Sequence, residues 1–273
     1  MPDTLVATER DGAVLIVKLV NAASRNSLTM EMRQQLGAAV KQAEADAAVR
    51  SVFLTGDGPT FCSGGDLHHL KTACDPWPVH RRFRNLSRWL TPLITLDKPV
   101  VIGVNGHAVG GGMGLALTGD IVLAGESASF ISGFFRLGAI PDISIMYHLP
   151  RLIGMARAKK FLFEGQSFSA QQAADLGLVS RVVPDAELYA AGLKEAKRLA
   201  DGPAEVMGLA KTLMARSFET SLHDMMSFEG FGQALAMSNP EFREGLDALI
   251  ERRPADFIGA ASASTQASNG SAE

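Results

Sequence analysis

Cysteine is almost absent from this sequence of 273 residues, in which Cys62 and Cys74 are the only two. Their spacing matches no metal-binding motif, so we expect neither a disulfide framework nor a metal site, and a reducing compartment fits. Blocks of lysine or arginine are also missing, and the net charge is −3. This balance argues against a protein that binds nucleic acid or a membrane surface, so local groups must hold any anionic ligand.

Long uninterrupted apolar runs are missing too, because Asn105, His107, Asp120 and several glycines break the longest one. We therefore expect no membrane span. Residues 1–4 show neither the basic start nor the apolar core of a signal peptide, which favours a cytoplasmic protein. With 47% hydrophobic and 20% charged residues, the chain is long enough for one large globular domain or two modest ones.

The first half of the chain alternates strand and helix signals. Asp11-Gly12 between two apolar runs predicts a hairpin, since glycine supplies the positive φ angles of a tight turn. Thr29 is a candidate N-cap for a helix that continues to about Asp46, and Ser51–Thr55 is the next strand. Residues 79–96 are amphipathic, with an apolar face made of Phe83, Leu86, Leu90, Leu93 and Ile94. The pattern predicts an α/β architecture built from β-β-α units.

The second half is almost entirely helical in pattern from Ala156 onward, with one short strand at Ser180–Val183. The last helices are rich in methionine and phenylalanine. A short helical segment cannot bury that surface alone, so we expect it to pack against the core or another subunit. The final residues are rich in Ala, Ser and Gly, which is typical of a disordered tail.

Two glycine turns carry the chemistry of the sequence. One is Ser63-Gly64-Gly65-Asp66, and the other is Gly110-Gly111-Gly112, which follows the apolar residues 100–104. Each turn leads into a helix, where exposed backbone N–H groups and the positive helix end favour an anion. Two amides from two such turns can converge on one oxygen, which is an oxyanion hole.

These turns and their neighbours make the sequence resemble the enoyl-CoA hydratase/isomerase, or crotonase, superfamily. The resemblance extends from the loop at residues 21–28 to residues 244–249. The segments that carry it are 61–67, 105–112, 119–124, 138–142 and 171–179. It implies a crotonase (ClpP-like) spiral core over residues 1–200 and a helical trimerisation region over 201–258. The disordered tail that the composition predicts then covers residues 259–273. The resemblance also implies a homo-oligomer, either a trimer or a hexamer.

The resemblance further implies an acyl-CoA thioester as substrate, with coenzyme A as part of the substrate and no separate cofactor. Gly65 and Gly111 occupy the positions whose amides form the oxyanion hole. The residues expected to contact coenzyme A are Ser24, Arg25, Ser27, Leu28, Ser63, Gly64, Asp66 and Leu67. Those expected in the acyl pocket are Leu70, Phe83, Gly114, Phe134 and Phe135.

The sequence departs from the family pattern at the two positions where a hydratase carries carboxylates, which are here Gly114 and Phe134. Neither residue can transfer a proton, so ordinary hydration is not expected. One acid remains in the region, Asp142. Its surroundings resemble those of the 1,2-epoxyphenylacetyl-CoA isomerase branch most, although Ile143-Ser144-Ile145 follows it in place of the two glycines usual there.

Asp142 has two interpretations. Its apolar neighbours weaken the solvation of its carboxylate, which makes it a better base for a carbon acid. Alternatively, it caps a helix that begins near Ile143. We favour an acyl-CoA isomerase in which Asp142 is the single acid/base. The alternatives are a hydrolase or hydratase-type enzyme that uses Asp142, and an acyl-CoA-binding protein without activity.

Overall fold

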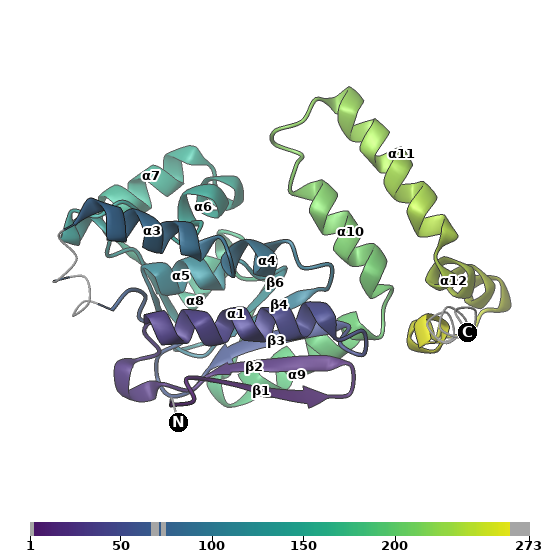
Figure 1. Ribbon diagram of the computed structural model, residues 1–273, viewed down its shortest axis with the longest axis horizontal. Helices are drawn as coiled ribbons and strands as arrows, with labels where there is room; N and C mark the ends of the chain where they lie inside the picture. Colours follow the sequence, from purple (N-terminus) through teal and green to yellow (C-terminus); the bar gives the residue numbers. More distant parts are fainter. Residues whose placement is uncertain (1–2, 67–70, 72–74, 263–273) are drawn as a thin grey trace.

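A computed structural model describes residues 3–66, 71 and 75–262 of the chain (Figure 1). Its centre is a sheet of six strands in the order β1-β2-β3-β4-β6-β9. β1 and β2 pair antiparallel, and the other neighbours in this sheet pair parallel. The strands are β1 (Val6–Asp11), β2 (Val14–Leu19), β3 (Ser51–Gly56), β4 (Val100–Val104), β6 (Ile121–Gly125) and β9 (Arg181–Val183).

Both faces of this sheet are covered, which explains why its central strands are continuous apolar runs. Alternate side chains of β2, β3 and β4 join two separate clusters. On one face they meet α1 (Met30–Ala45) and α4 (Leu90–Ile94), and on the other they meet α9 (Leu188–Ala200). Phe53 marks the second face, because α9 passes so close that a Cβ at Gly192 would lie 2.5 Å from Phe53 Cζ and closer still to Cε2 of the same ring.

The helix expected after Thr29 is confirmed. Thr29 is the N-cap of α1 and accepts a hydrogen bond from the Met32 N–H at 3.2 Å. The predicted apolar face is buried, and it comprises Met32, Leu36, Ala39, Val40 and Ala43. The amphipathic segment 79–96 instead divides into α3 (Pro76–Leu86) and α4. Its Phe83 was wrongly assigned to the buried face: it is 38% exposed, because it lies at a cavity.

A second, three-stranded sheet lies next to the two glycine turns. It consists of β5 (His107–Val109), β7 (Ser129–Ile131) and β8 (Ser167–Ser169) in the order β5-β7-β8. β5 leads through Gly110 into α5 (Gly111–Ala116). After β7 come the short helix η2 (Phe135–Leu137), then α6 (Ile145–Ile153), α7 (Met155–Phe163) and α8 (Ala170–Asp175).

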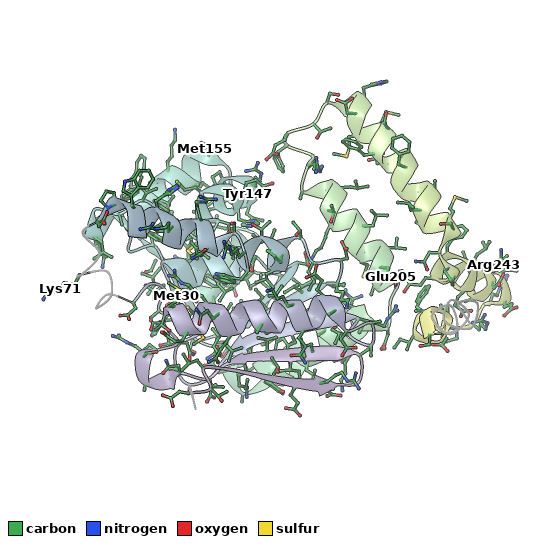
Figure 2. All side chains as sticks on the ribbon, viewed as in Figure 1. Met30, Lys71, Tyr147, Met155, Glu205 and Arg243 are labelled. Carbon is green, nitrogen blue, oxygen red and sulfur yellow. The ribbon has the colours of Figure 1, made fainter. Side chains whose placement is uncertain are left out.

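Three helices form a C-terminal arm that extends away from the sheets: α10 (Ala204–Met214), α11 (Leu222–Ser238) and α12 (Pro240–Glu251) (Figure 1). The arm is fixed at its base by Arg50, which precedes β3. The buried Arg50 guanidinium donates to Glu241 Oε1 at 2.6 Å and to the carbonyls of Ala200 and Gly202. Figure 2 shows Arg243 of α12 at the far end of the molecule from Met30 of α1.

Residues 257–262 form a further helical segment, which includes the first four residues of the expected disordered tail. Asp256 explains this extension, because its carboxylate accepts a hydrogen bond from the Gly259 N–H at 2.9 Å, as an N-terminal cap does. The alanines that follow have the highest helix propensity. The rest of the expected tail, residues 263–273, lies outside the described residues.

Candidate active site

The two glycine turns lie in direct contact. A parallel bridge joins Cys62 to Ala108: the Cys62 N–H donates to His107 O at 3.1 Å, and the Val109 N–H donates to Cys62 O at 2.9 Å. Gly64 has a φ of 82°, and a Cβ there would lie 2.5 Å from Val109 O and 3.0 Å from Gly111 N. Only glycine fits this position, because a side chain would push the first turn away from the second.

Gly110, with a φ of 51°, lies between β5 and α5 as the N-cap residue of the helix. Its N–H donates to Ile131 O at 2.8 Å, so β7 fixes the start of the helix. Gly112 faces the bridge, since a Cβ there would lie 2.7 Å from the carbonyl carbon of Cys62 and closer still to its oxygen. The N–H groups of Gly111 and Gly112 lie in the first turn of α5, where amides need acceptors from outside the helix.

Gly65 and Gly111 line one cavity of about 780 Å³, together with Asp142. Asp142 is half-buried, and its Oδ1 lies 3.5 Å from the position that a Cβ on Gly111 would occupy. The structure therefore places a carboxylate next to the first amide of α5. The other predicted site residues in the cavity wall are Leu28, Ser63, Asp66, Phe83 and Phe134.

The backbone after Asp142 makes a tight, unusual turn. Ile143 and Ser144 both have positive φ angles, 48° and 58°. Asp142 O accepts the Ile145 N–H at 3.2 Å, and Ser144, not Asp142, is the N-cap residue of α6. The alternative that Asp142 caps this helix is therefore wrong. Asp142 lines the cavity, and its Oδ1 lies beside Gly111.

The loop at residues 24–27 is hydrogen-bonded to the first glycine turn, Ser63-Gly64-Gly65-Asp66. The Ser63 N–H donates to Arg25 O at 3.0 Å, and the Ser63 hydroxyl donates to Ser24 O at 3.4 Å. Leu28, at the end of this loop, donates its N–H to Gly64 O at 2.7 Å. The structure thus brings the two segments expected to contact coenzyme A together, although Ser24, Arg25, Ser27 and Gly64 do not line the cavity. Leu67 and Leu70 lie outside the described residues.

Several residues of the cavity wall were not predicted: Thr29, Met30, Glu31, Arg33, Val109, Gly110, Gly133, Arg136, Leu137, Ala139 and Ile140. The helical spacing of Met30 and Arg33 is a signal that they share a face of α1. The segment 136–140 carried no such signal, because it has no regular period. Leu137 and Ile140 are 60% and 72% exposed, so the rim of the cavity is apolar.

Cys62 lies close to the cavity but is fully buried. Burial raises the pKa of its thiol to about 12, so it stays protonated at neutral pH. A protonated thiol is a poor nucleophile, and Cys62 therefore offers no covalent chemistry here. Within the described chain, no group of three or more His, Cys, Asp and Glu residues is arranged to hold a metal ion.

Comparisons with known proteins identify the family of this chain. A family model described as enoyl-CoA hydratase/isomerase matches residues 9–260. The chain belongs to the enoyl-CoA hydratase/isomerase family. The 1,2-epoxyphenylacetyl-CoA isomerase of Escherichia coli (strain K12) is 37% identical to this family member over 239 residues, which are 86% of this chain and 90% of that relative. The mitochondrial enoyl-CoA hydratase of Pongo abelii is 29% identical over 248 residues, 91% of this chain and 84% of that relative.

A solved structure extends the comparison to the fold of the enoyl-CoA hydratase/isomerase family. The crystal structure of an enoyl-CoA hydratase/isomerase from Cupriavidus metallidurans CH34 has a TM-score of 0.88 at 31% identity and covers 93% of this chain and 96% of that one. The expected crotonase fold with a helical C-terminal region is thereby confirmed. No helix in the ranges that the structure describes is long and apolar enough to cross a bilayer.

Gly114 and Phe134, the two positions where the family resemblance led us to expect a hydratase's carboxylates, have different surroundings. We expected Gly114 in the acyl pocket, but it does not line the cavity, because Ile143 fills the space beside it. A Cβ at Gly114 would lie 2.8 Å from Ile143 Cβ and closer still to Ile143 O. The Phe134 ring lies over Gly110, 3.6 Å from where a Cβ would be. Phe135, also expected in the pocket, instead packs edge-to-face on Phe163 outside the cavity wall.

Proposed function

We propose that this chain is an acyl-CoA isomerase that works through an enolate. The thioester carbonyl binds the N–H groups of Gly65 and Gly111, and Asp142 removes a proton from the acyl chain. The protonated Asp142 then returns a proton to another carbon of the same chain. This transfer shifts a double bond or assists a ring expansion, with no net change in the atoms of the substrate.

The observation that carries the proposal is that Gly65, Gly111 and Asp142 line one cavity. Backbone donors in a protected site stabilise an oxyanion by roughly 3 kcal/mol each. A carboxylate beside one of those amides is in the place where it can take the proton whose loss creates the oxyanion. The family, whose relatives are named for acyl-CoA isomerisation and enoyl-CoA hydration, supports an acyl-CoA thioester as the substrate.

The residues at positions 114 and 134, Gly114 and Phe134, favour isomerisation over hydration. A hydratase needs two carboxylates that hold and activate one water molecule between them. The space beside Gly114 is filled by Ile143, and Phe134 presents an aromatic ring to the cavity. Asp142 is the carboxylate whose Oδ1 lies beside Gly111, 3.5 Å from where a Cβ would be.

We further propose that the protein assembles as a trimer or hexamer through its arm, in the cytoplasm. Within the described part of α11, Gly232 alone is buried. Large apolar side chains on the arm are more than half exposed, and they include Met214, Phe218, Leu222, Met226, Phe231, Leu235, Leu249 and Ile250. An apolar surface of this extent is typical of a subunit interface, and a second copy of the chain is the proposed partner.

The proposed function is tested by deuterium exchange. The protein is incubated in D₂O with 2-enoyl-CoA, 3-enoyl-CoA and epoxyphenylacetyl-CoA substrates, and products are analysed by mass spectrometry and NMR. Asp142→Asn is compared with Asp201→Asn, the same change at an exposed carboxylate outside the cavity wall. We expect exchange and bond shift to be lost in the first variant and kept in the second.

Three other results separate the alternatives. Addition of water that survives in Asp142→Asn contradicts the isomerase and favours a hydratase. Release of free coenzyme A that depends on Asp142 indicates a hydrolase. Tight binding of thioesters without exchange or turnover indicates a binding protein without activity.

A further inference from the structure

The turn at Ile143 and Ser144 adopts a backbone conformation that its residues disfavour. Both φ angles are positive, and Ile143 is β-branched, which makes this conformation a genuine outlier for it. Such a conformation persists only where the surrounding structure holds it, and it is found most often at functional sites. The turn directly follows Asp142, so its cause bears on the position of that carboxylate.

The side chain of Ile143 holds the turn in place. It is 3% exposed, and its Cγ1 lies 3.0 Å from the position of a Cβ on Gly111. Its main chain packs against Gly114, one turn further along α5. Ile143 is therefore inserted against the first turn of α5, and the two glycines leave the space that it occupies.

Hydrogen bonds on both sides complete the turn. Asp142 O accepts the Ile145 N–H at 3.2 Å, and Ser144 O accepts the N–H groups of Tyr147 and His148 at 2.9 Å each. The chain thus passes directly from the carboxylate to α6, with no flexible linker. A displacement of Ile143 from α5 must displace the neighbouring Asp142.

We propose that Ile143 is a positioning residue, whose buried side chain holds the Asp142 carboxylate against Gly111 in the reactive geometry. The proposal rests on the function proposed above, because it assigns to Ile143 the placement of the single acid/base. Residue 143 could adopt this backbone more easily as glycine, but a glycine has no side chain to insert against α5. The side chain provides preorganisation, which matters because a displacement of about 1 Å can cost 100-fold in rate.

The test compares Ile143→Ala and Ile143→Gly with Ile153→Ala. Ile153 is buried at the far end of α6, the helix that follows the turn, so its truncation removes a buried isoleucine side chain away from Asp142. With an accepted thioester, we expect kcat per folded protein to fall about 10- to 100-fold in both Ile143 variants. KM stays within about 3-fold, because the oxyanion hole and cavity remain. Ile153→Ala keeps the wild-type kcat, and Ile143→Val restores most of it.

A second measurement reports on position directly. A well-placed single base returns part of the abstracted proton to the substrate, whereas a misplaced one exchanges it with solvent first. In D₂O, we expect more deuterium per product molecule from Ile143→Ala than from the wild type or Ile153→Ala. If Ile143→Gly does not fold, the comparison of Ile143→Val with Ile143→Ala tests the positioning role.

The proposal is overturned if Ile143→Ala keeps the wild-type kcat and deuterium content, or if Ile153→Ala loses as much of both. Failure of the proposed function looks different, because then the wild type shows no exchange or Asp142→Asn exchanges as well as the wild type. Those two proteins are measured in the same series, so the two failures are distinguished.

Discussion

Replacing Gly112 by alanine should separate the two glycine turns and expose how much the site depends on their contact. The new Cβ would lie 2.7 Å from the carbonyl carbon of Cys62 and 2.9 Å from Cys62 Cβ. Carbon atoms in van der Waals contact are about 3.5–4.0 Å apart, so the backbones must move apart by about 1 Å. Overpacking of this kind costs about 1–3 kcal/mol of stability.

The same displacement moves the Gly111 amide relative to Gly65. Because a misplacement of about 1 Å can reduce a rate 100-fold, we expect the exchange rate per folded protein to fall by about that factor. The assay is thioester exchange in D₂O, with denaturant unfolding to measure stability. Circular dichroism checks that Gly112→Ala is folded under the assay conditions.

Gly208→Ala is the matched control. Gly208 lies in α10, and a Cβ there would lie 2.6 Å from Asp97 Cα, a comparable backbone clash at a site outside the cavity wall. We expect a similar loss of stability with a wild-type exchange rate. A wild-type rate in Gly112→Ala, or an equal loss in Gly208→Ala, would refute the argument that contact between the turns sets the geometry.

Three further changes probe the elements around the site. Ser144→Gly should raise the free energy of unfolding by about 1 kcal/mol in a denaturant titration, because glycine accepts a positive φ without strain; an unchanged or lower value contradicts the strain. Burial, with the nearby charge of Arg151, lowers the pKa of His148 in the folded protein. The unfolded chain therefore binds a proton at His148 more readily, and the free energy of unfolding falls as the pH drops below 6.5. His148→Leu should remove that pH dependence, and an identical slope in the variant would exclude His148 as its source. Glu241→Ala leaves the buried Arg50 guanidinium without its carboxylate. In a denaturant titration it should lower the free energy of unfolding by about 3–5 kcal/mol, and the arm should be cleaved earlier by a protease. A change below about 1 kcal/mol would show that this ion pair does not fix the arm.

Local signals explain what could be predicted from the sequence. The N-cap of α1 and its buried face follow from Thr29 and an apolar period of 3.6, which act over a few residues. The two glycine turns were recognised because each carries its own conformational signal. That they can meet at one oxygen was inferred from the turns and supported by the family resemblance. No local pattern encodes the contact itself, since the Cys62–Ala108 bridge joins segments 46 positions apart.

Contacts between distant segments explain what could not be predicted. Gly114 was placed in the acyl pocket, but Ile143, 29 positions later, occupies the space beside it. The positive φ of Ile143 itself is imposed by packing against α5, against the preference of a β-branched residue. Phe83 was assigned to a buried face because its spacing is helical, whereas a cavity next to α3 leaves it exposed.

The use of main-chain amides as the proposed oxyanion donors has a consequence for how the reaction rate depends on pH. Both proposed oxyanion donors are main-chain amides, which neither gain nor lose a proton over the range in which proteins stay folded. A thioester bound between Gly65 and Gly111 would therefore experience the same donors at pH 5 and at pH 9. A titration in the rate per folded protein then does not come from the groups that hold the carbonyl. The pH dependence of the rate would then report mainly on proton transfer, and little on the binding of the thioester carbonyl.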